Sequence, residues 1–249
     1  MLMEPLLDKL HTLRLPAFRE GLREQMGNPQ YAELAFEERL ALLVEKECLR
    51  RQNRSLQRRL KQAVFPVSAV MADVDLSPAR GLDRSQVLDL AQGNWVEAKR
   101  NVLIVGPTGS GKTYLACALG EANCIAGYTV RYQRTSRLLA SLVKARKDGD
   151  YMDCLRDFAR VDLLILDDWM RDVVDVEQAR ELLEVLDDRF NHSATMVAGQ
   201  VPVDEWYRRI PDPTLAEAIL DRLIHNAYRL ELTGESQRKL RGFRSMPNT

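Results

Sequence analysis

Residues 102–113 read Val-Leu-Ile-Val-Gly-Pro-Thr-Gly-Ser-Gly-Lys-Thr, and this stretch decides the fold. Its first four residues are apolar and mostly β-branched, which predicts a buried strand. The next eight residues, 106–113, satisfy the spacing G-x-x-x-x-G-K-[ST] of a phosphate-binding loop. Residues 114–119 are mostly apolar and predict a helix. A strand, a glycine-rich loop and a helix in this order indicate a P-loop nucleotide-binding protein.

The chemistry of phosphate binding explains the residue types in this loop. Glycines let the backbone turn tightly and bring successive N–H groups up to phosphate oxygens. We expect Lys112 to reach the β and γ phosphates of ATP and the Thr113 hydroxyl to bind Mg²⁺. The alternative is a glycine-rich turn without a ligand, and this spacing occurs by chance in about one of 100 chains of this length. The residues expected to bind ATP are Gly106, Pro107, Thr108, Gly109, Ser110, Gly111, Lys112 and Thr113.

Two adjacent acids follow a second apolar segment. Residues 161–168 read Val-Asp-Leu-Leu-Ile-Leu-Asp-Asp, which places Asp167 and Asp168 at the end of a predicted strand. In P-loop proteins an acid at this position holds Mg²⁺, so Asp167 is the expected metal-side acid. Asp168 is then placed to polarise an attacking water, which favours ATP hydrolysis over phosphoryl transfer by a small-molecule kinase. The alternative is a strand end with two solvated aspartates.

From residue 100 onward, short β-branched segments alternate with helical ones. This alternation predicts an α/β fold with a mostly parallel, five-stranded sheet that carries helices on its faces. We expect strands over 102–105, 130–133, 163–167, 195–198 and 228–232, and helices over 112–126, 136–147, 152–160, 176–190, 203–209 and 214–226.

The first 65 residues have a different character. They are rich in Leu, Arg, Glu and Gln and poor in β-branched residues, which favours helices. We expect one helix that ends near Pro16, a second over 17–25 and a long one over 32–64, with a linker over 65–78. The predicted domains are a helical one over 1–70, for DNA or partner binding, and an ATPase domain over 75–249.

Overall composition limits the choices only a little. Lys plus Arg equals Asp plus Glu at 36 each, so net charge neither favours nor excludes a nucleic-acid partner. The four cysteines form no C-x-x-C pair and suggest free thiols in a reducing compartment. No apolar run approaches the roughly 20 residues of a membrane span. We therefore expect a cytoplasmic protein that has no membrane partner.

The sequence resembles the IstB-like ATP-binding proteins, which are AAA+ ATPases close to the DnaC helicase loaders. Three segments carry the resemblance: the phosphate-binding loop, the run Leu-Ile-Leu-Asp-Asp-Trp at 164–169, and the block that starts Leu-Asp-Arg-Leu at 220 and continues through Gly-Glu-Ser-Gln-Arg at 234–238. The helical N-terminal region, with Arg-Gln-Asn-Arg at 51–54, is also similar. The resemblance covers most of the chain and implies an AAA+ core with a truncated helical lid.

The resemblance also implies roles that spacing alone could not. Arg222 matches the arginine finger, which would reach the γ-phosphate of a neighbouring subunit and so require a homo-oligomer. Arg238 matches the second sensor arginine, and Gln200 falls at the first sensor position. The alternatives are ordinary surface arginines and a strand-end glutamine. Residues such as Asp89, Trp95 and Lys99, just before the first strand, are expected near the adenine.

A basic stretch in the long helix suggests DNA binding. On a helix, Arg50, Arg51, Arg54, Arg58 and Lys61 fall within an arc of about 100°, with Leu49, Leu56, Leu60 and Val64 opposite. Only Arg59 lies off the arc, and no acid occurs between Glu47 and Asp73. The alternative is a solvated face balanced by upstream acids. DNA contacts here would be directed at the backbone of a duplex, sensitive to salt and weakly sequence-specific.

The residues predict an ATP-dependent ATPase with a basic helix suited to DNA, and the resemblance implies an AAA+ regulator that assists a transposase in DNA transposition. The resemblance also implies the cycle, in which ATP would favour self-assembly along duplex DNA and hydrolysis would undo it or signal the transposase. The alternative is a DnaC-like loader of a replicative helicase.

Overall fold

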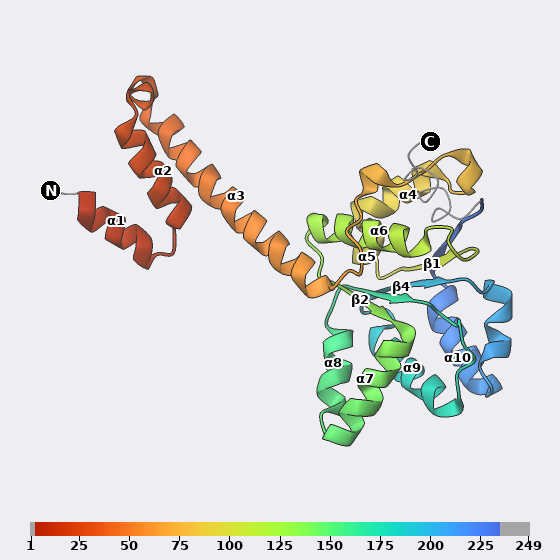
Figure 1. Cartoon of the computed structure of the whole chain (residues 1–249). Coiled ribbons are helices and arrows are strands. Elements are labelled where there is room, and N and C mark those ends of the chain that lie inside the picture. Colours follow the sequence, from red (N-terminus) through yellow and green to blue (C-terminus); the bar gives the residue numbers. More distant parts are fainter. Residues whose placement is uncertain (1–2, 235–249) are drawn as a thin grey trace, which may run out of the picture. The chain divides into compact units, whose positions relative to one another are not determined.

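The computed structural model describes residues 3–234 (Figure 1). The chain forms two compact units, Met1–Arg58 and Arg59–Thr249. This geometric division lies earlier in the chain than the predicted functional division into 1–70 and 75–249, which remains a prediction. Within the described residues, none of the helices combines the length and the apolar character that crossing a membrane requires.

The first unit is helical, as the composition predicts. It contains α1 (Met3–Thr12), α2 (Pro16–Gly27), the 3₁₀ turn η1 (Pro29–Glu33) and most of α3 (Phe36–Ala63). Helix α3 begins four residues later than predicted because the chain forms η1 first. Leu43 packs on Gly21, where an added Cβ would lie 2.8 Å from the leucine Cδ2.

The buried carboxylate of Glu47 connects α3 to the start of α2. Its Oε2 accepts the N–H groups of Ala17 and Phe18 at 2.9 and 3.2 Å. These N–H groups lie in the first turn of α2, which lacks backbone acceptors. Glu47 therefore accepts hydrogen bonds from N–H groups that have no partner within the helix, and its negative charge interacts favourably with the positive end of the helix dipole.

The second unit is built on a five-stranded sheet in which every neighbouring pair is parallel. The strands are β1 (Asn101–Val105), β2 (Val130–Arg134), β3 (Leu163–Asp167), β4 (Ala194–Gly199) and β5 (Ala227–Glu231), in the order β2-β3-β4-β1-β5. This confirms the predicted α/β fold. Strands β1, β3 and β4 are almost wholly apolar because helices cover both of their faces.

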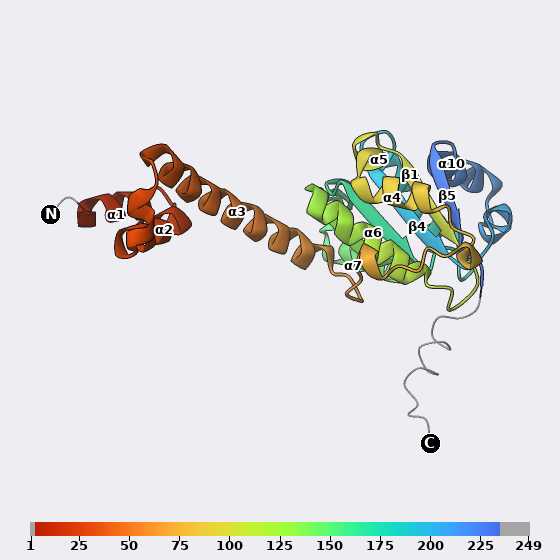
Figure 2. The ribbon, with the colours of Figure 1, turned by 90° about the horizontal axis from the view of Figure 1, so that it is seen from above.

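Helices cover the two faces of the sheet in separate layers. One layer contains α4 (Arg84–Gln92), α5 (Asn94–Glu97) and α6 (Lys112–Ala126) (Figures 1 and 2). The other contains α7 (Thr135–Asp148), α8 (Tyr151–Ala159), α9 (Val176–Arg189) and α10 (Pro213–Ile224). The main apolar core lies between this second layer and the sheet, around Leu103, Leu164 and Trp169.

The structure corrects two sequence-based expectations. Helices α4 and α5 were not predicted, although Asp83 caps the start of α4 and Gly93, at φ 87°, ends it. The helix expected over 203–209 is instead two 3₁₀ turns, η4 (Val203–Glu205) and η5 (Tyr207–Arg209). The indole N–H of Trp206 donates to the carbonyl of Val201 across 2.9 Å and fixes these turns. The predicted truncated lid falls on residues 235–249, outside the described residues.

Candidate nucleotide site

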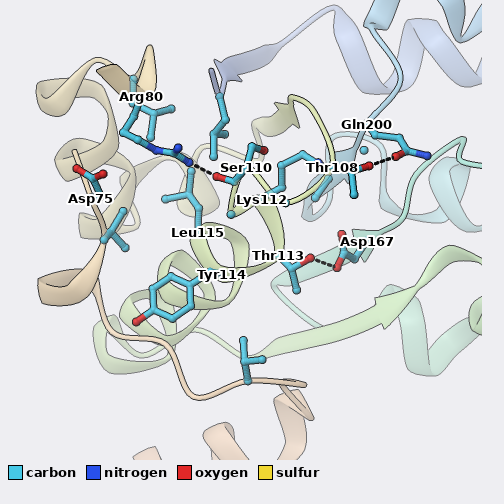
Figure 3. Close-up of a pocket in the computed structure, with 18 of the residues that line it drawn as sticks. Asp75, Arg80, Thr108, Ser110, Lys112, Thr113, Tyr114, Leu115, Asp167 and Gln200 are labelled. Atoms are coloured by element: carbon cyan, nitrogen blue, oxygen red, sulfur yellow. Dashed lines mark hydrogen bonds between the residues drawn. The ribbon is translucent and has the colours of Figure 1, made fainter. Parts of the chain in front are cut away.

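A cavity of about 420 Å³ lies at the carboxyl ends of the central strands (Figure 3). Strand β1 lies between β4 and β5, and its connection to β2 passes over β4 and β3. In open parallel sheets such a change in strand order leaves a crevice at the carboxyl ends, where ligands bind. The cavity volume falls in the range of small-molecule sites.

The loop between β1 and α6 forms the floor of this cavity. Gly106, Gly109 and Gly111 have φ values of 155°, 82° and 96°, which residues with side chains rarely adopt. A Cβ on Gly106 would also lie 2.5 Å from the carbonyl oxygen of Leu232. The Lys112 ammonium donates to the Gly106 carbonyl at 2.8 Å, so the lysine side chain curls over the loop. The loop therefore has the form of a phosphate cradle at a helix start.

Asp167 ends β3 beside this loop, as predicted. Its Oδ2 accepts the Thr113 hydroxyl at 2.7 Å (Figure 3). The same oxygen accepts the Tyr132 hydroxyl at 2.6 Å. Burial, and then the hydrogen bond to Asp167, raise the pKa of Tyr132, so the phenol remains a neutral donor. The sequence analysis did not select Tyr132. Because β2 lies next to β3, with Gln133 opposite Leu166, the strand order could have suggested it.

Asp168 follows Asp167 at the cavity edge and lies between two arginines. Its Oδ2 is 3.4 Å from Arg171 Nη1 and 3.7 Å from Arg134 Nε. The side chain of Asp168 is 34% exposed. Neither arginine was selected from the sequence, since the pairing depends on how the turn after β3 folds.

Gln200 also reaches the cavity, immediately after β4. Its side-chain oxygen accepts the Thr108 hydroxyl at 2.5 Å (Figure 3). This contact links the phosphate-binding loop to the position where the resemblance implies the first sensor. The sensor role itself remains a prediction.

The residues before β1 that were expected near the adenine do not line the cavity. Trp95 is buried and donates to the Leu90 carbonyl, Asp89 is exposed on α4, and Lys99 lines a separate small recess. The far wall of the cavity comes instead from the segment 67–82, which includes most of the predicted linker and folds back beside the phosphate-binding loop. It contains Arg80, which is 5% exposed and donates to the Ser110 carbonyl (Figure 3). The residues of this wall are Val67, Asp73, Val74, Asp75, Arg80 and Leu82.

Arg222 lies away from this cavity. Its carbonyl accepts the Asn101 side-chain amide at 2.8 Å, which places it near the amino end of β1, whereas the phosphate-binding loop follows the carboxyl end. Its guanidinium pairs with Asp187 on α9 and donates to the Ala218 carbonyl at 2.8 Å. Arg222 is therefore not part of the cavity of its own subunit. Arg238 lies outside the described residues.

The basic stretch of α3 is exposed, as its sequence pattern predicts. Arg50, Arg54, Arg58 and Lys61 all face solvent. Arg51 differs, since it pairs with Glu47 at 3.0 Å and donates to a backbone carbonyl of the first unit. Of the apolar residues opposite, Leu56 and Leu60 are half-buried, whereas Leu49 and Val64 are exposed. DNA binding by this stretch remains a prediction.

Comparisons with known proteins connect this architecture to a family. Residues 8–245 match the family described as IstB-like ATP binding protein. A Sinorhizobium fredii protein whose name assigns it to an insertion sequence as an ATP-binding protein is 44% identical over 96% of this chain and 98% of its own. A similarly named Pseudomonas fluorescens protein is 41% identical over 81% of this chain and 88% of its own.

Solved structures support the fold. The AMPPCP-bound DnaA from Aquifex aeolicus has a TM-score of 0.59 at 18% identity, over 75% of this chain and 58% of that chain. DnaI has a TM-score of 0.57 at 20% identity, over 71% of this chain and 94% of that chain. At these identities the likeness shows a shared AAA+ fold. The family match over nearly the whole chain and the close relatives together show that this protein belongs to the IstB-like ATP-binding proteins.

Proposed function

We propose that this protein binds ATP with Mg²⁺, hydrolyses it, and uses the cycle to assist a transposase in DNA transposition. One observation carries the chemistry: Thr113, next to Lys112 at the end of a loop shaped to hold phosphates, donates its hydroxyl to the Asp167 carboxylate at 2.7 Å. Family membership supports ATP as the nucleotide. The names of the relatives support a role in insertion sequences.

The residues present suit a magnesium ion. The Thr113 hydroxyl and the Asp167 carboxylate offer hard oxygen ligands, which Mg²⁺ prefers, and Mg²⁺ takes its remaining ligands from water and phosphate. When bound, the ion would neutralise charge on the β and γ phosphates. Tyr132 orients the carboxylate of Asp167 through its own hydrogen bond.

The remaining residues of the cavity fit a hydrolytic role. Lys112 would leave the loop carbonyls for the phosphates, because a phosphate oxygen is a stronger partner than a carbonyl. Asp168 would polarise the attacking water, and Gln200 would help to orient it. The second sensor role belongs to Arg238 in this proposal.

The position of Arg222 supports assembly into an oligomer. A guanidinium near the amino end of β1 does not serve its own cavity, but it can serve that of an adjacent subunit in a head-to-tail contact. We therefore propose a homo-oligomer with a trans arginine finger. The basic stretch of α3 would hold the backbone of duplex DNA, and the protein would act in the cytoplasm.

A DnaC-like helicase loader remains the alternative function. The fold likeness to DnaI is compatible with it but does not favour it over transposition, because that likeness shows the fold alone. Co-purification with a hexameric helicase would support the loader. A neighbouring gene for an integrase-like transposase, and stimulation of strand transfer by that transposase, would support the first proposal.

Steady-state ATP hydrolysis, with and without duplex DNA and at increasing protein concentration, tests the proposal. We expect a rate per subunit that rises with both DNA and protein concentration. An ATPase rate that does not change when DNA is added would point to the helicase loader or to an enzyme controlled by another partner. A phosphorylated small-molecule product in place of free phosphate would contradict the proposed hydrolysis.

A further inference from the structure

Arg171 is a cation of the nucleotide cavity to which the proposed mechanism gives no role. Its guanidinium lies between two carboxylates, with Nη1 3.4 Å from Asp168 Oδ2 and Nη2 2.8 Å from Asp172 Oδ2. The Arg171 side chain is 44% exposed, so these ion pairs contribute little to the stability of the fold. Arg171 contacts Asp168, the acid that we expect to polarise the attacking water, and this contact suggests that Arg171 has a role in the reaction.

The backbone beside Arg171 is held firmly, which fixes the point from which its side chain can move. Trp169 is fully buried and packs edge-on against Trp206, with 5.9 Å between ring centroids. Asp168 and Met170 have φ values of 56° and 49°, in the left-handed region that side-chain-bearing residues rarely adopt. Such strain persists where packing imposes it, and it often occurs at functional sites. The buried tryptophan thus fixes a turn that presents Asp168 and Arg171 together.

The carboxylate of Asp168 has a second arginine partner. Arg134, at the end of β2, places its Nε 3.7 Å from the same oxygen that faces Arg171. Both guanidinium groups compete with water for this oxygen, because the attacking water must donate to the same acceptor that the arginines occupy. The two ion pairs therefore restrain the acid.

A terminal phosphate would change this competition. It carries more negative charge than one carboxylate and offers several oxygens in a geometry that matches the planar guanidinium fork. Arg171 lines the same cavity as Lys112 and Thr113, which are expected to hold the end of the triphosphate. A diphosphate lacks the group that would attract Arg171 away from its carboxylates.

We propose that Arg171 senses the γ-phosphate within its own subunit. Its guanidinium leaves Asp168 for the terminal phosphate when ATP binds, and it returns when ADP remains. The exchange removes one of the two guanidinium groups at Asp168 Oδ2, and this opens the carboxylate to the attacking water while ATP is present. This inference rests on the proposed ATPase function, and it concerns an arginine distinct from Arg222 and Arg238.

Affinities for two nucleotides test this role in the full-length protein. We expect Arg171→Ala to weaken binding of a non-hydrolysable ATP analogue about tenfold, because one charge-assisted contact is lost, and to change ADP affinity less than about twofold. Turnover should fall about tenfold or more. Arg171→Lys keeps the charge but not the planar guanidinium fork, so its affinities and turnover should lie between those of the wild type and of Arg171→Ala. Calorimetric titration measures the affinities, and phosphate release measures turnover.

Two further variants make the test specific. Asp172→Asn removes a competing carboxylate and should raise the preference for the ATP analogue over ADP by roughly two- to fivefold. Arg156→Ala is the matched control, because Arg156 is an exposed arginine paired with Asp153 on α8 and does not line the cavity. It should leave both affinities and turnover unchanged.

The contrary results are distinct from one another. Equal weakening of both nucleotides by Arg171→Ala, with a lower melting temperature, would show a structural role and overturn the inference. If the wild-type protein hydrolyses ATP and Arg171→Ala leaves both affinities and turnover unchanged, the inference is overturned as well, while the proposed function stands. Failure of the wild-type protein to bind ATP would overturn the proposed function itself.

Discussion

The Thr113 hydroxyl and the Tyr132 hydroxyl donate to the same oxygen of Asp167, at 2.7 and 2.6 Å. One donor comes from the phosphate-binding loop and α6, and the other from β2, so two elements fix the position of one carboxylate. If this oxygen faces Mg²⁺ when ATP is bound, the Thr113 hydroxyl must turn to the ion and Tyr132 must continue to orient the acid.

Removing the Thr113 hydroxyl is therefore expected to abolish Mg²⁺-dependent hydrolysis. Thr113→Val keeps the shape of the side chain but loses the oxygen, and turnover should fall about 100-fold or more. Thr113→Ser keeps the oxygen and should remain within about threefold of wild type. Phosphate release measured against Mg²⁺ concentration checks both variants. Full activity of the valine variant would place the metal elsewhere.

Lys112 is the second residue whose loss should be decisive. Its ammonium lies against two loop carbonyls, Gly106 and Pro107, at 2.8 and 2.9 Å, within reach of a phosphate on the same loop. We expect Lys112→Ala to abolish ATP binding or hydrolysis because the β and γ phosphates lose their cation. Lys144→Ala, an exposed lysine on α7, is the control and should behave as wild type. Fluorescent-nucleotide binding distinguishes loss of affinity from loss of turnover.

The features that could be predicted from the sequence are those encoded over short distances. Apolar β-branched runs such as 102–105 identify the strands, and glycine spacing at 106–111 identifies the loop, because backbone conformation there depends on local residue type. Asp167 could be assigned because it directly ends such a strand. The end of α2 at Gly27 and Asn28 could also be predicted, because it depends on local residue type.

The missed residues depend on contacts between distant segments. Arg80 reaches the carbonyl of Ser110 across 30 positions of the chain, and no spacing rule links an arginine just after the predicted linker to this loop. Arg171 follows β3 closely, but its direction depends on a left-handed turn imposed by buried Trp169. Such positions follow from packing, which a single sequence does not reveal.

Arg189 offers a test of stability that is independent of nucleotide. It is 1% exposed, and its guanidinium donates to the carbonyls of Phe158 and Val161 at 2.5 and 3.0 Å and to the Thr195 hydroxyl at 3.1 Å. Burial lowers the pKa of Arg189 to about 9, so it remains charged at neutral pH. The side chain thus joins the end of α8 to the start of β4.

Arg189→Met would fill a similar volume but leave these acceptors without donors. We expect the free energy of unfolding to fall by about 2–4 kcal/mol, since buried unpaired acceptors are costly. Urea denaturation measures the change. Arg160→Met, at a nearby exposed arginine, should change it by less than about 0.5 kcal/mol. Equal stability of the two variants would mean that the guanidinium contacts contribute no net stabilisation.

DNA binding by α3 should respond to charge reversal at exposed positions. The double variant Arg54→Glu with Arg58→Glu should weaken duplex binding and reduce the slope of log affinity against log salt by about 2, as two phosphate contacts are lost. The control is Lys9→Glu with Arg23→Glu, which makes the same change in net charge at exposed positions of α1 and α2. Fluorescence anisotropy over a salt series provides the measurement. If both double variants bind DNA as the wild type does, the DNA surface lies outside the basic stretch.

A shared active site makes the sharpest prediction for Arg222. Arg222→Ala should lose hydrolysis because the neighbouring cavity lacks its finger, and Asp168→Asn should bind ATP without hydrolysing it. In an equal mixture, an Asp168→Asn subunit can lend its intact Arg222 to the intact cavity of an Arg222→Ala subunit, so activity should return to about a quarter of the wild-type rate per subunit. Arg180→Ala, an exposed arginine on α9, should remain active alone. If the mixture stays inactive while both variants still assemble, as judged by light scattering, Arg222 does not act across a subunit boundary.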